Sequence, residues 1–313
     1  MNKPSKELLS KYNVYYKQDT SFSAFARLLQ SQWRQKKGFP NAPGKLGNYL
    51  SYDDAIKTRN NFLTGKIKTL VQYEVYRANV EGKLISEPRI WDNLLSSQPL
   101  CFNLFGEFHF DMNLATQYFK KLFPDRVYYV SNILFEHSPG RGSDEYTGDH
   151  SAFDVFVEYQ SGTGKNGFIG IEVKYAENLK EDKTKANKVF QKHEKEYLKV
   201  ARGTNIFPES SFAHLSQVPL QQIWRDHLLS ITTLQDYDEV FFVFLFPSKN
   251  EECQNAITKY TGLLKTNDCK HNGFYTMYLE KFIKTLQEIC KSEWTNELEI
   301  RYLGTESIYT NAK

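Results

Sequence analysis

The sequence predicts an α/β fold in which a mixed central sheet is flanked by helices, with a helical extension at each end of the chain. Three observations predict it. Four β-prone segments lie between residues 126 and 246, helical patterns separate the third segment from the fourth, and helical patterns also precede and follow the group. With 313 residues, the chain can bury a large core in one elaborated domain or in two average ones.

The first part of the chain, residues 1–84, is expected to form a helical cap. Residues 21–37 place apolar side chains at helical spacing, and basic residues gather toward the end of this segment. Segment 36–48 is rich in glycine and proline and is expected to be a loop. Residues 52–78 are expected to form one long helix.

The core is expected between residues 85 and 250. A helix over 104–123 carries one apolar stripe and ends before Pro124. Strands are expected at residues 126–135, 151–159, 168–175 and 239–246, which are rich in β-branched and aromatic residues. The last of them is a nearly continuous apolar run, which is typical of a strand buried on both faces.

A charged insertion, residues 176–215, separates the third strand from the fourth and is expected to contain a helix over 181–202. A second helix is expected to open at Ser216, with Pro219 in its first turn. Residues 251–313 are expected to pack on the core as a C-terminal extension. It is expected to hold helices near 254–264 and 274–290 and a final strand at 298–303.

Composition argues against several classes of protein. The formal net charge of +3 is far below that of a dedicated nucleic-acid coat or chromatin protein. The four cysteines form no CxxC pair and the seven histidines no HxH or HExxH motif, which argues against a zinc site and a disulfide framework. The N-terminus has no apolar signal region, and the longest apolar run, residues 240–246, is too short to span a bilayer. The expected location is therefore cytoplasmic, with no membrane partner.

The loop GTGK at residues 162–165 looks like part of a phosphate-binding loop, but it lacks the required pattern. Tyr159 stands where the first glycine is needed, and Asn166 stands where Ser or Thr is needed. A strand rather than a helix follows, so no helix N-terminus would meet a phosphate. The loop is therefore expected to be a β-hairpin turn.

A turn centred on Thr163 fixes the register of its two strands and places Asp154 opposite Glu172. Opposed cross-strand Cβ atoms lie about 5 Å apart, and two like charges there are destabilising unless a cation lies between them. Lys174 follows on the same face, and Gly170 is expected to leave room there for a substrate backbone. The hairpin therefore predicts a site for a hard divalent cation beside an ammonium group.

Two other interpretations remain open at this point. Glu-x-Lys on a strand, here Glu172-Val173-Lys174, is common and usually marks a solvated face with a local salt bridge. A register shifted by one residue would turn Asp154 toward the core. The alternation of apolar residues argues against that shift, and it places Phe153 on the opposite, apolar face.

With these residues the sequence resembles the PD-(D/E)XK nuclease superfamily, whose core has an Asp on its second strand and E-x-K on its third. Asp154 and Glu172-Val173-Lys174 fall in the matching places. The segments NLLSSQPLCFNLFGEF, ILFE, IEVKYAEN and PLQQIWRDHLL look like the bacterial restriction-endonuclease-like branch, over roughly residues 85–250. Phe153 stands where the motif often has proline, and a long charged insertion follows Lys174. The resemblance implies a restriction-endonuclease-like core.

The resemblance also implies that Asp154, Glu172 and the carbonyl of Val173 bind Mg²⁺, with Mn²⁺ expected to substitute. Lys174 would orient a water molecule and stabilise developing negative charge. The implied activity is phosphodiester hydrolysis by a DNA endonuclease, in restriction, defence or repair. A catalytically silent nucleic-acid-binding or scaffold protein with the same fold is the alternative. A homodimer is also considered, because many such enzymes need two sites for a double-strand cut.

Four further residues are candidates for the site. The family often adds a Glu from its first helix, which points to Glu107, although the helix dipole also favours an acid there. Glu136, at the end of the first strand, is a rival that could equally be a surface residue. The family places a Gln on the helix after the insertion, which points to Gln222 unless that residue is simply polar surface. Arg225 is a candidate phosphate contact. The lysines of the insertion could track a nucleic-acid backbone or belong to a solvated helix, since acids interleave with them.

Overall fold

A five-stranded mixed sheet forms the centre of the molecule. The computed structural model describes residues 1–177, 179 and 183–304. The strands lie in chain order; the first three pair antiparallel, and the last two are added in parallel. This sheet confirms the predicted fold class. Its strands are β1 Tyr129–His137, β2 Phe153–Gln160, β3 Asn166–Val173, β4 Glu239–Phe246 and β5 Phe274–Tyr278.

Helices precede, interrupt and follow the sheet. Within the described residues, none of them combines the length and the apolar composition needed to cross a bilayer. Before β1 lie α1 Lys6–Lys11, α2 Ser21–Lys36, α3 Tyr52–Thr58, α4 Gly65–Glu81, α5 Arg89–Asp92, α6 Ser97–Phe110 and α7 Met112–Leu122. Between β3 and β4 lie α8 Lys183–Arg202, α9 Phe212–Leu215 and α10 Gln221–Thr232, with 3-10 turns at Glu209–Ser211 and Thr233–Gln235. The remaining helices are α11 Glu251–Thr261, α12 Cys269–Asn272, α13 Leu279–Ile289 and α14 Glu293–Tyr302.

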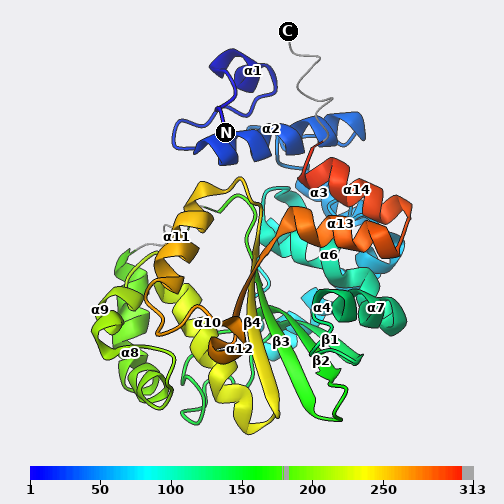
Figure 1. Cartoon of the computed structure of the whole chain (residues 1–313). Helices are drawn as coiled ribbons and strands as arrows, with labels where there is room; N and C mark the ends of the chain where they lie inside the picture. The colour runs from blue at the N-terminus through cyan, green and yellow to red at the C-terminus, as the bar shows by residue number, and fades with distance from the viewer. Residues whose placement is uncertain (178, 180–182, 305–313) are drawn as a thin grey trace.

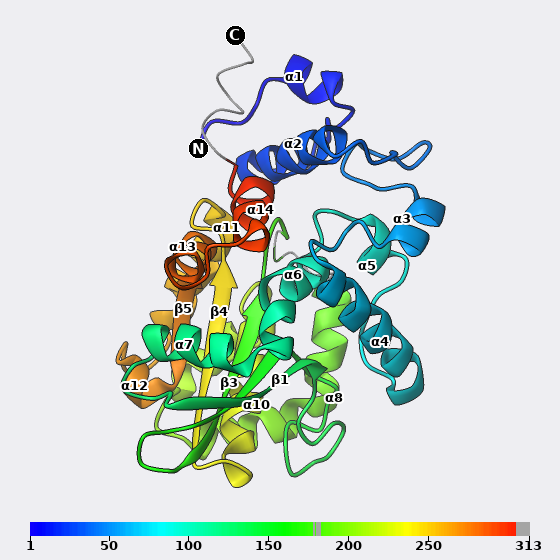
Figure 2. The same cartoon turned by 90° about the vertical axis from the view of Figure 1, so that its right-hand side faces the viewer.

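The sheet separates two helical layers (Figure 1). Helices α8 to α11 lie on one side of it, and α6, α7 and α13 lie on the other. Helices α1 and α2 lie across one end of the molecule, where α2 packs against α14 (Figure 2). Helices near the two ends of the chain are therefore neighbours in space.

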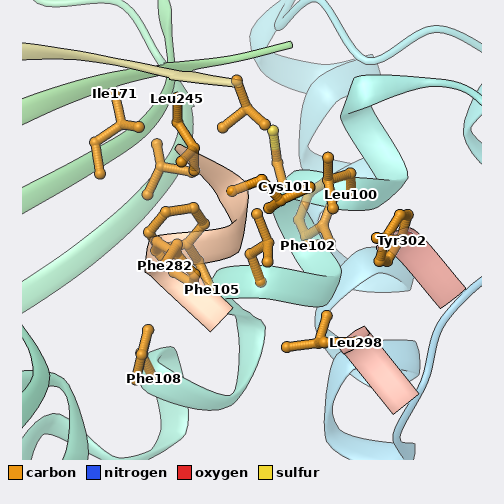
Figure 3. Close-up of a cluster of buried hydrophobic side chains, with 14 of the residues drawn as sticks. Leu100, Cys101, Phe102, Phe105, Phe108, Ile171, Leu245, Phe282, Leu298 and Tyr302 are labelled. Atoms are coloured by element: carbon orange, nitrogen blue, oxygen red, sulfur yellow. The ribbon is translucent and has the colours of Figure 1, made fainter. Parts of the chain in front are cut away.

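Helix α6 lies in the largest of the three hydrophobic clusters found among the described residues (Figure 3). Its Leu100 and Phe105 are fully buried and belong to one cluster with Ile171 of β3 and Tyr302 of α14. The rings of Phe105 and Phe282 of α13 meet edge to face, with centroids 4.9 Å apart. Burying one large apolar side chain of this kind contributes about 1.5–3 kcal/mol to the stability of the fold. A helix that is apolar on most sides is therefore stable only in the interior.

The opposite face of the sheet is buried as well. Phe156 and Phe168 stack with ring centroids 4.4 Å apart and share a second core with Trp224 of α10. Phe153 also belongs to this core, so its predicted place on the other face is wrong. A Cβ at Gly170 would come within 2.5 Å of a ring carbon of Phe153. Gly170 therefore makes room for Phe153, and the expectation that it admits a substrate backbone is wrong.

The predicted register of the hairpin is confirmed. Residues 161–165 form the turn, Gln160 pairs with Asn166, and Val155 pairs with Ile171. This is the register of a turn centred on Thr163. The ladder to β3 ends at Val155, so the residues before it are not held to strand alternation on that side, which explains the orientation of Phe153.

Two helices that were expected to be long are each divided. The expected helix over 104–123 is α6 followed by α7, because Asp111 leaves the helical conformation (φ −140°, ψ 85°) and its carboxylate caps α7. The expected helix over 52–78 is α3 followed by α4. Arg59 ends α3 in the left-handed conformation, and the Thr64 side chain caps α4. The apolar spacing continues across each break, so a prediction from that spacing gives one long helix where capping makes two.

The C-terminal elements also differ from expectation. The expected strand at 298–303 belongs to helix α14, which opens with a capping box formed by Ser292 and Thr295. The fifth strand comes instead from residues 274–278, expected as helix, which pair in parallel with β4. Helix α10 begins at Gln221 rather than Ser216 because residues 216–220 form turns. The charged helix is described from Lys183 onward; residues 181 and 182 lie outside the described part.

Candidate active site

A cavity of about 500 Å³ opens where β2 and β3 separate. Asp154 and Glu172 lie on these strands, Lys174 follows β3, and Gln222 reaches the cavity from α10. One wall comes from the loop after α4 and the first turn of α6, and the other from residues 148–152 and α8. A second cavity, of about 480 Å³, is lined by residues such as Tyr237 and contains none of the predicted site residues.

Asp154 and Glu172 are each held through one carboxylate oxygen. The backbone N–H of Val173 donates to Asp154 Oδ2 at 2.7 Å. Glu172 is buried, and its Oε1 accepts from Gln222 Nε2 at 2.7 Å. Burial raises the pKa of Asp154 well above its usual range, and the charges of Glu172 and Glu136 add to the rise. In the described part of the chain, no hydrogen bond engages Asp154 Oδ1 or Glu172 Oε2, so both oxygens remain available to a ligand.

Lys174, Gln222 and Glu172 each contact the other two. The Lys174 ammonium lies 2.6 Å from Glu172 Oε1 and donates to Gln222 Oε1 at 3.0 Å. Burial acts to lower the pKa of Lys174, but the charges of Glu172 and Asp154 outweigh it and raise the pKa above its usual range. Lys174 therefore stays protonated at neutral pH and acts as a donor. Gln222 can satisfy both partners because its amide both donates and accepts.

Glu136 faces the same cavity from the end of β1. Its φ of 48° is left-handed, a strained conformation for a residue other than glycine, and such strain is often found at functional sites. Its Oε1 accepts from Gln98 Nε2 at 2.6 Å. Burial raises the pKa of Glu136 to about 7, the Gln98 hydrogen bond acts in the opposite direction, and the charge of Glu172 adds to the rise. Glu136 is thus a buried residue of the cavity rather than a surface residue.

The structure places Glu107 outside the cavity. Its carboxylate accepts from the Thr64 hydroxyl and lies 3.4 Å from Lys66, both at the start of α4. Helix α6 reaches the cavity instead with Ser97 and Gln98. Gln98 is nine positions before Glu107, which is about 14 Å along a helix axis. Gln98 also donates to the carbonyl of Leu84 at 2.6 Å. It was not predicted, and its only sequence signal was its place in the first turn of this helix.

Asp226 is a second cavity residue that the sequence reasoning missed. It lies one turn after Gln222 on α10 and is 3% exposed. Burial raises its pKa well above the usual range, and the charge of Glu172 adds to the rise. The spacing of four residues from Gln222 on one helix was the signal that could have found it. Arg225, which was predicted as a phosphate contact, also lines the cavity.

The wall formed by α8 is tied to the loop before β2 through Asp149. This buried carboxylate accepts from Tyr197 of α8 at 2.6 Å and from the hydroxyls of Thr147 and Ser151. Burial acts to raise the pKa of Asp149, but these hydrogen bonds outweigh it and lower the pKa. Helix α8 bends at His193, which lines the cavity. The charged insertion therefore forms part of the site.

The donor set suits a hard divalent cation. Asp154 and Glu172 supply carboxylates, and the carbonyl of Val173 follows directly on β3. Mg²⁺ is typically held by one or two carboxylates and keeps several waters. No group of three His, Cys, Asp or Glu side chains within the described ranges is arranged to hold one ion. The fit therefore rests on the two carboxylates and the Val173 carbonyl. A cation there would offset both the burial of Asp154 and its repulsion by Glu172, which together raise the pKa of Asp154.

Comparison with known proteins identifies the family of the chain. A family model described as the PD-(D/E)XK nuclease superfamily matches residues 17–304, which include every residue of the cavity described above. No protein of curated function and no solved structure gives a significant match. The five-stranded mixed sheet flanked by helices is a restriction-endonuclease-like α/β fold. The chain belongs to the PD-(D/E)XK nuclease superfamily.

Proposed function

We propose that this protein is a divalent-metal-dependent endonuclease that hydrolyses phosphodiester bonds in DNA and uses Mg²⁺, for which Mn²⁺ can substitute. One observation carries the proposal: Asp154, Glu172 and Lys174 converge in one cavity, where Gln222 bonds to both Glu172 and Lys174. Membership of the superfamily supports the same class of reaction.

Asp154 and Glu172 would hold the ion together with the carbonyl of Val173. A bound divalent cation would supply positive charge at the scissile phosphate and favour ionisation of an attacking water. The hydrogen bond from the Val173 N–H fixes the orientation of Asp154 before any ligand binds. Glu172 is fixed in the same way by Gln222.

Lys174 would donate to the attacking water and to the phosphate oxygens on which negative charge develops. A protonated ammonium cannot act as the general base, so the role of Lys174 is that of a charged donor. Gln222 would keep it in place. Glu136, held by Gln98, adds a further carboxyl group to the lining of the cavity. Arg225 is proposed to contact a phosphate of the substrate. Glu107 is left out of the proposed site because its carboxylate contacts Thr64 and Lys66 at the start of α4, away from the cavity.

The proposal is tested by incubating the wild type and Asp154→Asn with linear duplex DNA, circular duplex DNA, single-stranded DNA and RNA. Each substrate is tested with Mg²⁺, Mn²⁺ or EDTA. The wild type should cut DNA with either ion and not with EDTA. Asp154→Asn, which keeps the hydrogen bond from Val173 but loses the charge, should be at least about 100-fold slower.

The other outcome is a protein that binds nucleic acid without turnover. Binding of DNA or RNA by the wild type with no cleavage of any substrate would favour the silent binder or scaffold. Cleavage of RNA alone would support the assignment as a nuclease but would show that the substrate is RNA rather than DNA.

A further inference from the structure

Helix α4 carries a row of exposed apolar side chains on its outer face. Tyr73, Tyr76 and Val80 are spaced by three and four residues, so they share one face of the helix, and Leu84 follows shortly after it. These four residues, the outer row of α4, are 54%, 69%, 72% and 57% exposed. The other face of α4 is buried against α6, and the helix lies at the edge of the molecule in Figure 2. Exposed apolar patches of this kind typically mark interaction sites.

The two tyrosine rings of the outer row are open to a ligand. The guanidinium of Arg77 lies 5.6 Å from the ring centroid of Tyr73. Two hydrogen bonds of 2.8 and 3.0 Å from Arg77 to Glu81 hold that guanidinium in place, so the cation–π contact restrains the Tyr73 ring. In the described part of the chain, no other aromatic ring packs on Tyr73 or Tyr76, and neither hydroxyl takes part in a hydrogen bond. Both rings therefore offer apolar surface to a flat ligand.

The outer row leads into the cavity of the candidate active site. Helix α4 ends at Gly82, and Leu84, two residues later, lines that cavity. Arg141 donates to the Gly82 carbonyl at 2.6 Å, which ties this end of α4 to the loop between β1 and β2, whose residues 148–152 form the opposite wall. From Val80 to Tyr73 the row extends about 10 Å along the helix axis. A strand leaving the cavity past Leu84 would therefore meet the two rings in turn.

Charge and chemistry indicate what binds there. Residues 65–89 contain five basic and three acidic residues, an excess that favours an anionic ligand. Every nucleobase has a π-face that can stack on an aromatic side chain, whatever the sequence. Bases within a duplex already stack on one another, so only unpaired bases can use the tyrosines. A second copy of this chain fits less well, because a stable dimer buries about 800 Å² on each partner, more than these four side chains can supply.

Resting on the proposed nuclease function, we propose that the outer row of α4 binds unpaired nucleotides of the substrate, with bases stacked on Tyr73 and Tyr76. The opposite wall of the cavity presents Lys192 of α8, which suits a phosphate backbone. The cavity lies between these two surfaces. The preferred substrate is therefore DNA in which a single-stranded arm adjoins a duplex, with the junction at the cavity.

Fluorescence anisotropy tests the proposal with four labelled DNAs: a blunt duplex, the same duplex with a 5′ arm or a 3′ arm, and a single strand. Asp154→Asn is present in every protein so that the DNA is not cut. This parent protein should bind at least one armed duplex more tightly than the blunt one. Replacing both Tyr73 and Tyr76 by alanine should weaken binding to that armed DNA at least about 30-fold, the effect of losing two base–aromatic stacks, and leave binding to the blunt duplex unchanged. Replacing both by phenylalanine, which keeps the rings, should retain the tight binding.

Tyr128 and Tyr129 provide the matched control, because they are two exposed tyrosines outside the cavity. Replacing both by alanine should leave the affinities for armed and blunt DNA unchanged. Thermal unfolding shows that each variant folds.

Equal affinity of the parent protein for armed and blunt DNA would overturn the proposal, as would a preference for the arm that survives replacement of Tyr73 and Tyr76 by alanine. A wild-type dimer that these replacements separate into monomers in analytical ultracentrifugation would also overturn it and assign the row to a second copy. A preference for the arm with no cleavage of any DNA by the protein that keeps Asp154 would instead refute the nuclease function and leave this binding surface standing.

Discussion

At the scale of single residues, His227 of α10 gives the fold a pH dependence. Its ring is fully buried; Nε2 donates to the carbonyl of Asn272 at 2.6 Å, and Nδ1 accepts from the Tyr260 hydroxyl at 2.8 Å. This arrangement requires the neutral ring. Burial lowers the pKa of His227 to about 4. An unfolded histidine has a pKa of about 6.5, so the unfolded chain binds the extra proton first as the pH falls.

The contribution of His227 to the free energy of unfolding should therefore be fully present above pH 6.5 and decrease as the pH falls from 6.5 to 4. At pH 5 the expected loss is about 2 kcal/mol. Urea denaturation at pH 7.5 and pH 5 measures the loss. His227→Gln should reduce the difference between the two pH values, whereas His214→Gln, at an exposed position, should not. An unchanged pH dependence in His227→Gln would show that the ring does not control it.

The residues of the hairpin could be predicted from sequence because their relation is local. One turn and the period of a strand are enough to predict the register of the hairpin, and the structure has that register as far as its last pair, Val155 with Ile171. Asp154 and Glu172 lie directly beyond that pair. The position of Glu107 depends on which face of α6 meets the sheet, which tertiary packing decides. Asp226 and Gln98 were missed for the same reason: each reaches the cavity through the packing of a helix far from the hairpin in sequence.

At the scale of elements, α8 presents exposed lysines on both sides of its bend at His193. Lys188 and Lys192 lie four residues apart before the bend, and Lys195 and Lys199 lie four apart after it, so each pair shares a helix face. No ion pair from the described residues neutralises these four side chains. Lys192 also lines the cavity. This placement favours the prediction that the insertion contacts a nucleic-acid backbone.

Replacing all three of Lys188, Lys195 and Lys199 by glutamine should weaken DNA binding and make the binding less dependent on salt. If each lysine neutralises one phosphate, the slope of log K against log salt should fall by about 2.7 for duplex and about 2 for single-stranded DNA. This slope is measured by the fluorescence anisotropy of labelled DNA, with Asp154→Asn present in every protein so that the DNA is not cut. The control replaces Lys259, Lys281 and Lys284, exposed on α11 and α13. Equal slopes for the two triple variants would show that the lysines of α8 are solvated and do not contact DNA.

The existence of the main elements followed from the sequence, whereas some of their ends and types did not. The continuous apolar run predicted β4 with the bounds that it has. Capping by Asp111 and Thr64 divided two helices whose apolar pattern ran on. Residues 274–278 form a strand because β4 offers them an edge for pairing, which no local pattern reveals.

At the scale of the whole molecule, Arg301 of α14 joins the two ends of the chain. It is fully buried and donates to the carbonyl and side-chain oxygens of Asn61 at 2.7 and 2.6 Å and to Gln30 at 3.1 Å. Its guanidinium also lies 4.3 Å from the Trp33 ring centroid. We propose that the predicted segments 1–84, 85–250 and 251–313 consequently unfold as one unit.

Arg301→Ala should lower the free energy of unfolding by about 3 kcal/mol, because it leaves several buried oxygens without a donor. Arg301→Lys should lose less, since it keeps the charge but not the planar fork. Urea denaturation followed by tryptophan fluorescence and circular dichroism measures both. The two signals should coincide in one transition. Separate transitions, or an unchanged midpoint for Arg301→Ala, would contradict the single unit.

The central claim is that Lys174 and its two acids carry out metal-dependent hydrolysis, and the cleavage rate of linear duplex DNA at saturating Mg²⁺ tests it most directly. Lys174→Ala is compared with Lys165→Ala, which removes an exposed lysine from the turn of the same hairpin. The account predicts that Lys174→Ala is at least about 100-fold slower than the wild type, while Lys165→Ala cuts at the wild-type rate. Equal rates for the wild type and Lys174→Ala would contradict the account.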